Sequence, residues 1–143
     1  MCDIDHFKVI NDDQGHAAGD DVLQQFAERA QKSIRSNSDW VVRYGGEEFL
    51  MVLPETPHTA GMIVAEKIRS IIAATGFVTP AGSTPVTVSF GVASTGNEGP
   101  DGSLTVDALI RVADECLYQS KQEGRNRTTG REIAPAPILV ATG

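Results

Sequence analysis

Residues 40–53 read WVVRYGGEEFLMVL and carry the clearest structural signal in the chain. Two apolar runs flank a glycine pair, which predicts a β-hairpin, because glycine readily adopts the positive φ that tight hairpin turns require. Glu47 and Glu48 stand at the tip of this hairpin. Beside a second acidic strand they would suit a divalent cation held against phosphates. The alternative is a solvent-exposed turn that happens to be acidic.

The composition limits the classes of function. A chain of 143 residues is long enough to bury a core, and its net charge of −7 argues against broad binding to nucleic acids or anionic membranes. Cys2 and Cys116 form neither a disulfide framework nor a metal-binding spacing. No run of residues is long and apolar enough for a membrane span, and the N-terminus does not resemble a signal peptide. We therefore expect a cytoplasmic domain without direct membrane contact, or the cytoplasmic part of a membrane-anchored parent.

Strand and helix patterns alternate along the chain in the order β-α-β-β-α-β-α. This order predicts an α+β fold with helices packed on a mostly antiparallel sheet. The first strand begins without a lead-in, so we expect a piece of the domain upstream. Apart from the hairpin, the predicted elements are strands at 1–4 and 86–92, helices at 17–34, from a cap within 56–59 to Gly76 and from Thr105 to Gly124, and a loop at 97–102.

Asp3 and Asp5 frame the end of the first strand. Side chains alternate along a strand, which would put the two carboxylates on the same side. Because the strand ends there, the other expectation is that one points into the site and the other into the edge of the core. With Glu47 and Glu48 on a nearby hairpin, three or four carboxylates would converge. Such oxygen ligands suit Mg²⁺ or Mn²⁺ rather than zinc. The alternative is a strand-end pair that caps the following turn.

Two further clusters suit a nucleotide, each with a plainer alternative. Asn11 and Asp20 have the side chains that recognise guanine, although residues 11–21 also favour turns and a helix cap. His16 has no partner histidine at metal-binding spacing, and we expect His6 and His58 on the surface or in packing contacts. Lys121 and Arg125 suit a triphosphate, but cations near the end of a helix are also favoured by its dipole alone.

Five motifs in the chain belong together: DIDHFK (3–8), NDxxGHxxGD (11–20), RYGGEEF (43–49), SFGVA (89–93) and ADxxLYxxKxxGRN (113–126). They resemble the GGDEF family of bacterial diguanylate cyclases over residues 1 to about 128, which implies a domain at 1–128 with a fold like that of nucleotidyl cyclases and the polymerase palm. From the composition of the last residues we expect an extended or disordered tail at 129–143.

Members of this family condense two GTP into cyclic di-GMP and release two pyrophosphates. Each domain holds one GTP, so two domains must face each other, and the domain is normally fused to an upstream sensory or receiver module. The resemblance implies roles for the matching residues. Asp3, Glu48 and the Ile4 carbonyl would bind Mg²⁺ or Mn²⁺, and Glu47 would be a further metal neighbour or would draw the proton from the 3′-hydroxyl. Amides around His6 and Phe7 would bind phosphates, Lys8 would stabilise developing charge, and Lys121 and Arg125 would hold the β- and γ-phosphates. Asn11 and Asp20 would recognise guanine, with His16 nearby.

This sequence departs from the family pattern in two places. The family carries a segment before the acidic strand, with the pattern Asp-x-Leu-Thr-x-Leu-x-Asn-Arg, that closes part of the nucleotide pocket. The family's Arg-x-x-Asp inhibitory site has its aspartate at Asp39, but Ser36 occupies the arginine position and Arg35 lies one residue further away. We therefore expect weakened product inhibition. The alternative function is a catalytically weak domain that binds GTP or cyclic di-GMP as a sensor or interaction module, and a structural, dimer-forming fragment is a third reading.

Overall fold

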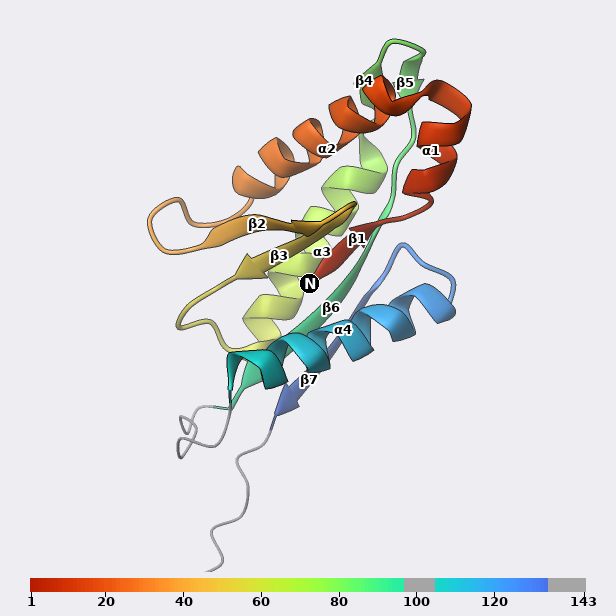
Figure 1. Cartoon of the computed structure of the whole chain (residues 1–143). Helices are drawn as coiled ribbons and strands as arrows, with labels where there is room; N and C mark the ends of the chain where they lie inside the picture. Colours follow the sequence, from red (N-terminus) through yellow and green to blue (C-terminus); the bar gives the residue numbers. More distant parts are fainter. Residues whose placement is uncertain (97–104, 134–143) are drawn as a thin grey trace, which may run out of the picture.

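The computed structural model describes residues 1–96 and 105–133, which build a five-stranded sheet with helices on both faces (Figure 1). The sheet has the spatial order β2-β3-β1-β6-β7, and its strands are antiparallel except for the parallel pair β6–β7. This arrangement confirms the predicted α+β class. The strands are β1 (Cys2–Ile4), β2 (Trp40–Gly45), β3 (Glu48–Val52), β6 (Val88–Thr95) and β7 (Thr128–Ile133).

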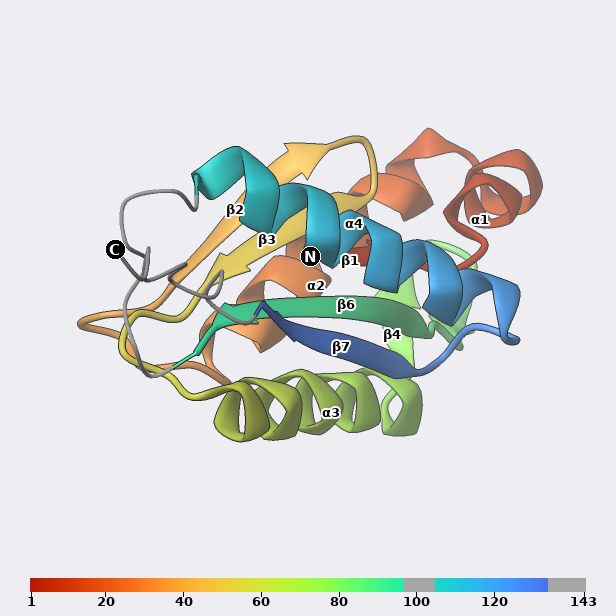
Figure 2. The same ribbon diagram turned by 90° about the horizontal axis from the view of Figure 1, so that it is seen from below.

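The helices form two layers around this sheet. Figure 2 shows α3 and α4 on opposite faces. Buried side chains of α2 and α3 share one core with strand residues such as Cys2, Ile4 and Phe49. Strand side chains alternate, so Asp3 points to the opposite face, which α4 covers. The helices are α1 (Phe7–Gln14), α2 (His16–Gln31), α3 (His58–Ala74) and α4 (Val106–Gln122), and β4 (Phe77–Thr79) pairs with β5 (Gly82–Thr84) in a separate hairpin.

Gly91 sets how closely α4 approaches the sheet. A Cβ at this position would collide with the backbone of Ala113 and Leu117. Glycine therefore lets the helix backbone lie directly on β6. Ser120 then donates a hydrogen bond to the carbonyl of Phe90 at 2.8 Å, which fixes the last turn of α4 over the strand beside β1.

The structure adds three elements that the sequence patterns missed. Residues 7–14 form α1, although residues 11–21 favour turns, because buried Phe7 and Ile10 hold one face of the helix. The β4–β5 hairpin was not predicted. Residues 128–133 form β7 in parallel register with β6, so the sheet continues past the predicted boundary at residue 128. The predicted loop at 97–102 and the part of the predicted tail after residue 133 lie outside the described residues.

The remaining predicted elements are confirmed with shifted ends. The first predicted helix, 17–34, spans His16–Gln31, and the predicted strand 86–92 spans Val88–Thr95. The helix predicted to begin at a side-chain cap within 56–59 begins after Pro57, without a side-chain cap. Among the described helices, none combines the length and apolar character needed to span a membrane.

Candidate active site

Asp3 and Glu48 lie directly opposite each other on the neighbouring strands β1 and β3. Directly opposed residues of an antiparallel pair project to the same face of a sheet. The flanking residues Cys2 and Phe49 are buried in the core on the opposite face, where the ring centroids of Phe49 and Phe26 lie 4.7 Å apart. Both carboxylates are therefore on the face that α4 covers.

Lys121 joins them from the last turn of α4. Its Nζ lies 2.8 Å from Oδ2 of Asp3, and both side chains are largely shielded from solvent. The pKa of Asp3 is nevertheless raised: burial is the main cause, Glu47 and Glu48 add to it, and Lys121 opposes it. Burial of the Asp3 carboxylate thus outweighs its contact with Lys121.

The tip of the hairpin is fixed by backbone contacts. Gly46 has a φ of 51°, and its carbonyl accepts a 2.8 Å hydrogen bond from Nε of Arg43. The amide of Ile4 donates to the carbonyl of Glu47 at 3.3 Å. The tip is therefore tied to the end of β1, and the residues predicted to bind metal, Asp3, Ile4, Glu47 and Glu48, are brought together.

Asp5 has a different role from Asp3. Its Oδ1 accepts a hydrogen bond from Ser89, and its Oδ2 accepts from the Thr87 hydroxyl and the Asn126 amide, at 2.7, 2.7 and 3.0 Å. The side chain is buried. Asp5 therefore fastens the end of β1 to β6 and to the loop after α4, and these donors do not come from the following turn that the alternative expected it to cap. Polar Thr87 and Ser89, alternating with buried valines, were the sequence signal for this network.

The N-terminus of α1 follows β1 directly. His6 has a φ of 57°, and neither a side-chain cap nor an acidic residue occupies the first turn of the helix. The amides there form a setting suited to an anion, because a helix N-terminus carries partial positive charge. Phe7 has a buried side chain, and Lys8 extends into solvent, where its Nζ pairs with Asp12 at 2.6 Å. In this structure the Lys8 side chain thus pairs with a residue of its own helix, one turn further along.

Asn11 lies against the start of α2. A Cβ on Gly19 would collide with the Asn11 carboxamide, so the glycine makes room for this side chain. The next residue, Asp20, is exposed and lines a hollow of about 760 Å³ between α2 and the hairpin. His16 is exposed at the first position of α2. The structure thus brings Asn11 close to the helix that carries Asp20, and the guanine-reading role of the pair stays a prediction.

The loop after α4 carries Arg125 in a left-handed conformation, with a φ of 63°. Its amide donates to the Ser120 carbonyl at 3.0 Å, and the next amide, that of Asn126, reaches Asp5. Arg125 is therefore held near the end of β1 by its backbone, while its side chain is exposed.

Arg35 and Asp39 form a satisfied pair at the root of the hairpin. The guanidinium bonds Asp39 at 2.6 Å and also donates to the Pro54 carbonyl and the Thr56 hydroxyl. Arg35 lowers the pKa of Asp39 through this hydrogen bonding. The pair joins the chain entering β2 to the chain leaving β3. Weakened binding of cyclic di-GMP at this place stays a prediction. His58, expected in a packing contact, bonds Ser94 at 2.8 Å.

The carboxylates fit a hard divalent cation in kind, since Asp3 and Glu48 are opposed and Glu47 is adjacent. Across residues 1–96 and 105–133, however, no three histidine, cysteine or acidic side chains are drawn together closely enough to hold a metal ion. The Asp3 carboxylate is instead bonded to Lys121. The carboxylates are thus of the right kind for Mg²⁺ or Mn²⁺, but Asp3 is paired with a lysine, and the metal site stays a prediction.

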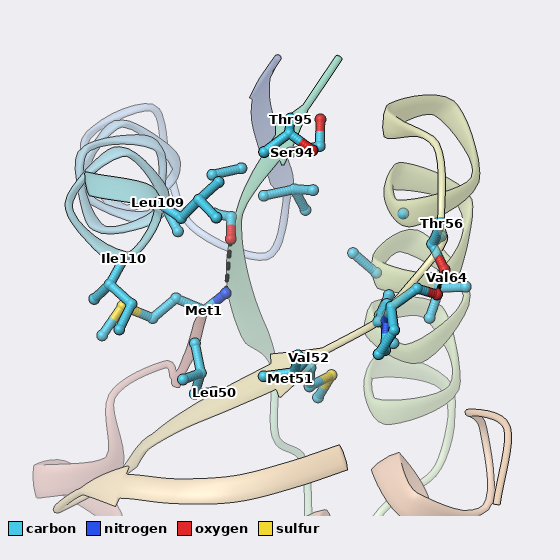
Figure 3. A pocket seen from close by; sticks show the side chains of 18 of the residues that line it. Met1, Leu50, Met51, Val52, Thr56, Val64, Ser94, Thr95, Leu109 and Ile110 are labelled. Carbon is cyan, nitrogen blue, oxygen red and sulfur yellow. Dashed lines mark hydrogen bonds between the residues drawn. The ribbon is translucent and has the colours of Figure 1, made fainter. Parts of the chain in front are cut away.

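A separate apolar cavity of about 660 Å³ lies at the other end of β1 (Figure 3). Figure 3 shows Leu109 and Ile110 of α4 on one side and Val64 of α3 on the other. The Met1 amino group donates to the Gly91 carbonyl at 2.8 Å, and burial lowers its pKa. No residue predicted for catalysis or binding lines this cavity, so it lies apart from the candidate site.

Curated proteins with similar sequences are longer than this chain. It is 41% identical over 133 residues to the response regulator PleD of Caulobacter vibrioides, covering 92% of this chain and 28% of that protein. It is 43% identical over 129 residues to diguanylate cyclase A of Treponema denticola, covering 90% of this chain and 33% of that protein. The chain thus spans a third or less of the length of these relatives.

Solved structures and a family model agree with this likeness. The active GGEEF domain of a diguanylate cyclase from Vibrio cholerae superimposes with a TM-score of 0.78 at 35% identity, covering 90% of this chain and 78% of that one. The GGDEF domain of DgcB from Caulobacter crescentus, in complex with c-di-GMP, gives 0.80 at 32% identity, covering 90% of this chain and 74% of that one. The model "Diguanylate cyclase, GGDEF domain" matches residues 1–127, and the chain belongs to the GGDEF domain family.

Proposed function

We propose that this chain is the catalytic domain of a diguanylate cyclase, which condenses two GTP into cyclic di-GMP and releases two pyrophosphates. The observation that carries the proposal is the arrangement around β1: Asp3 and Glu48 are opposed on neighbouring strands, and Lys121 lies 2.8 Å from Asp3. Carboxylates and a fixed cation at one point are the groups that phosphoryl transfer requires. The relatives named diguanylate cyclases support the same reaction.

Asp3, Glu48 and the Ile4 carbonyl would hold Mg²⁺ or Mn²⁺, with Glu47 beside them. When bound, such a cation supplies charge that offsets the negative charge on the reacting phosphates. Glu47 is the candidate to accept the proton of the attacking 3′-hydroxyl, because it stands at the tip of the hairpin and is only partly buried.

The remaining residues would bind the nucleotide. The start of α1, at His6 and Phe7, would offer backbone amides to phosphate oxygens, and Lys8 would turn from Asp12 to steady the charge that develops there. Lys121 and Arg125 would hold the terminal phosphates. At the other end of the nucleotide, Asn11 and Asp20 would donate to and accept from the guanine edge, with His16 nearby.

One domain holds a single GTP, so the reaction would need a second copy. Two bound nucleotides must face each other for the 3′-hydroxyl of one to attack the α-phosphate of the other. We propose a homodimer of domains, brought together by an upstream sensory or receiver domain in the parent protein. The relative named a response regulator, of which the chain spans 28%, supports a larger parent.

The test is to incubate the protein with GTP and Mg²⁺ over a range of protein concentrations and to measure cyclic di-GMP. We expect the rate per subunit to rise with concentration, since encounter of two domains limits turnover. GTP-specific binding without product at any concentration would instead favour the sensor alternative. Absence of nucleotide binding would contradict both readings.

A further inference from the structure

Lys121 has two candidate binding partners, Asp3 and the terminal phosphates of a nucleotide, and its ammonium group cannot bind both fully at the same time. In the structure its ammonium group bonds Asp3, with 2.8 Å between Nζ and Oδ2. In the proposed function the same group binds terminal phosphates, while Asp3 accepts a divalent cation. Two cations on one carboxylate repel each other, so the Lys121–Asp3 contact and the metal complex of Asp3 compete.

We propose that Lys121 is a positioning residue that covers Asp3 until a triphosphate arrives, so that Asp3 becomes available to a divalent cation together with the nucleotide and not before it. This inference rests on the proposed function, because it takes the phosphate chain as the group that draws Lys121 away.

The geometry suits a contact that forms and breaks easily. Lys121 reaches a single oxygen of Asp3, whereas an arginine could make a forked, two-point contact that is harder to release. The lysine stem is flexible, so its ammonium group can move by several ångströms without a change in the backbone. The helix itself stays in place, because Ser120 bonds both the Phe90 carbonyl and the Thr129 hydroxyl.

The charges around Asp3 favour this exchange. Asp3 is buried and lies directly opposite Glu48 on the neighbouring strand, so a cation nearby stabilises the ionised Asp3 carboxylate. In the ligand-free domain Lys121 is that cation. A triphosphate offers Lys121 several negative charges in place of one, and a divalent cation then neutralises the carboxylates that Lys121 leaves. Nucleotide binding and metal binding are thereby coupled through one side chain, and the coupling is reciprocal.

Arg125 provides a matched control. It carries the same charge four residues along, on the loop after α4, and in the described part of the chain its side chain makes no ion pair with Asp3. Removal of either cation weakens the positive field near the carboxylates, but only removal of Lys121 frees Asp3 from a direct contact.

The experiment measures binding of Mn²⁺ alone by electron paramagnetic resonance, with folding checked by circular dichroism. We expect Lys121→Gln to bind Mn²⁺ about tenfold more tightly than the wild type, and Arg125→Gln to stay within about twofold of it. In an Asp3→Asn background, adding Lys121→Gln should give no further gain, because the contact is already absent. With 3′-deoxy-GTP, which lacks the attacking hydroxyl, the wild type should gain more Mn²⁺ affinity than Lys121→Gln does.

The proposal is overturned if Lys121→Gln binds Mn²⁺ no more tightly than the wild type, or if Arg125→Gln produces the same gain. A gain that persists in the Asp3→Asn background also contradicts it, since the effect would then be long-range. The proposed function fails separately. If Lys121→Gln tightens Mn²⁺ binding as expected while the wild type forms no cyclic di-GMP from GTP, competition at Asp3 holds and cyclase activity does not.

Discussion

Two carboxylates in this molecule each bond a cationic side chain at a similar distance, but their pKa values are shifted in opposite directions. Asp3 lies 2.8 Å from Lys121, and Asp39 lies 2.6 Å from Arg35. The pKa of Asp3 is raised, chiefly by burial, whereas the hydrogen bonds from Arg35 lower the pKa of Asp39. Burial makes the difference, because it outweighs the contact with Lys121 at Asp3, whereas the hydrogen bonds from Arg35 outweigh it at Asp39; Glu47 and Glu48 raise the pKa of Asp3 further. The Lys121–Asp3 pair leaves the charged form of its carboxylate destabilised by burial, which suits a site that binds a ligand. The Arg35–Asp39 pair stabilises the charged form of its carboxylate, which suits a role in holding the fold together.

The two pairs lie at opposite ends of the β2–β3 hairpin. Arg35 closes the root by bonding Asp39 before β2 and the Pro54 carbonyl after β3. At the tip, the Ile4 amide bonds the Glu47 carbonyl and holds the glutamates beside β1. The Arg35–Asp39 pair thus fixes the base of the hairpin whose tip holds the glutamates beside Asp3.

The largest expected effect is on turnover. Asp3→Asn should reduce formation of cyclic di-GMP by at least about a hundredfold, because it removes a charged ligand from the reacting centre. It should leave the free energy of unfolding unchanged or raise it, since the fold disfavours the charge on Asp3. Turnover assays and urea unfolding check the two parts, with Glu132→Gln, an exposed change on β7, as control. Retention of near-wild-type turnover would contradict the assignment.

Asp5→Ala should have the largest effect on stability. The substitution leaves the Thr87 and Ser89 hydroxyls and the Asn126 amide without their shared acceptor. Loss of a buried charged acceptor of this kind costs about 3 kcal/mol. Urea unfolding measures the loss, and Asp5→Asn, which keeps one carbonyl acceptor, should recover part of it. An unfolding free energy within error of the wild type would show that the network contributes nothing.

The contrast between Asp3 and Asp5 also marks how far the sequence could lead. Strand alternation predicted that both carboxylates share a face, and the glycine pair predicted the acidic hairpin beside them. The sequence could not show which of the two faces the site and which is held by hydrogen bonds. The donors to Asp5 come from Thr87, Ser89 and Asn126, more than eighty residues away in sequence. Chain periodicity contains no information about such distant partners.

Lys121 and α1 show two other limits. The sequence placed Lys121 at the end of a helix, but its contact with Asp3 depends on how closely α4 approaches β6, which Gly91 permits. Residues 7–14 were missed because their asparagine and aspartates favour turns, and tertiary burial of Phe7 and Ile10 outweighed that preference. Strand β7 was missed because its polar residues resemble a tail until they pair with β6.

At the root of the hairpin, Asp39→Asn should lower the free energy of unfolding by about 1 kcal/mol, because Arg35 is half exposed and solvent screens the pair. Turnover per folded molecule should stay within about twofold of the wild type, since the pair lies at the far end of the hairpin from the glutamates. Comparison of urea midpoints and turnover for Asp39→Asn and Asp3→Asn tests the distinction. Loss of turnover without loss of stability in both variants would contradict the distinction between the two ion pairs.

The smallest expected effect is the pH dependence of that stability difference. The pKa of Asp39 is lowered in the folded state from an ordinary value of 3.8, so folding favours the ionised form. Its contribution is complete above that ordinary value and is lost as the pH falls through the lowered folded pKa. The gap in unfolding free energy between wild type and Asp39→Asn should therefore be largest near about pH 6 and shrink below about pH 3.

The pKa of Asp3 is shifted the other way, so ionisation of Asp3 opposes folding as the pH rises. The gap in unfolding free energy between wild type and Asp3→Asn should therefore change with the opposite sign. Urea titrations of the three proteins over this range decide the matter, because two gaps that moved together would mean that the ion pairs do not differ in kind.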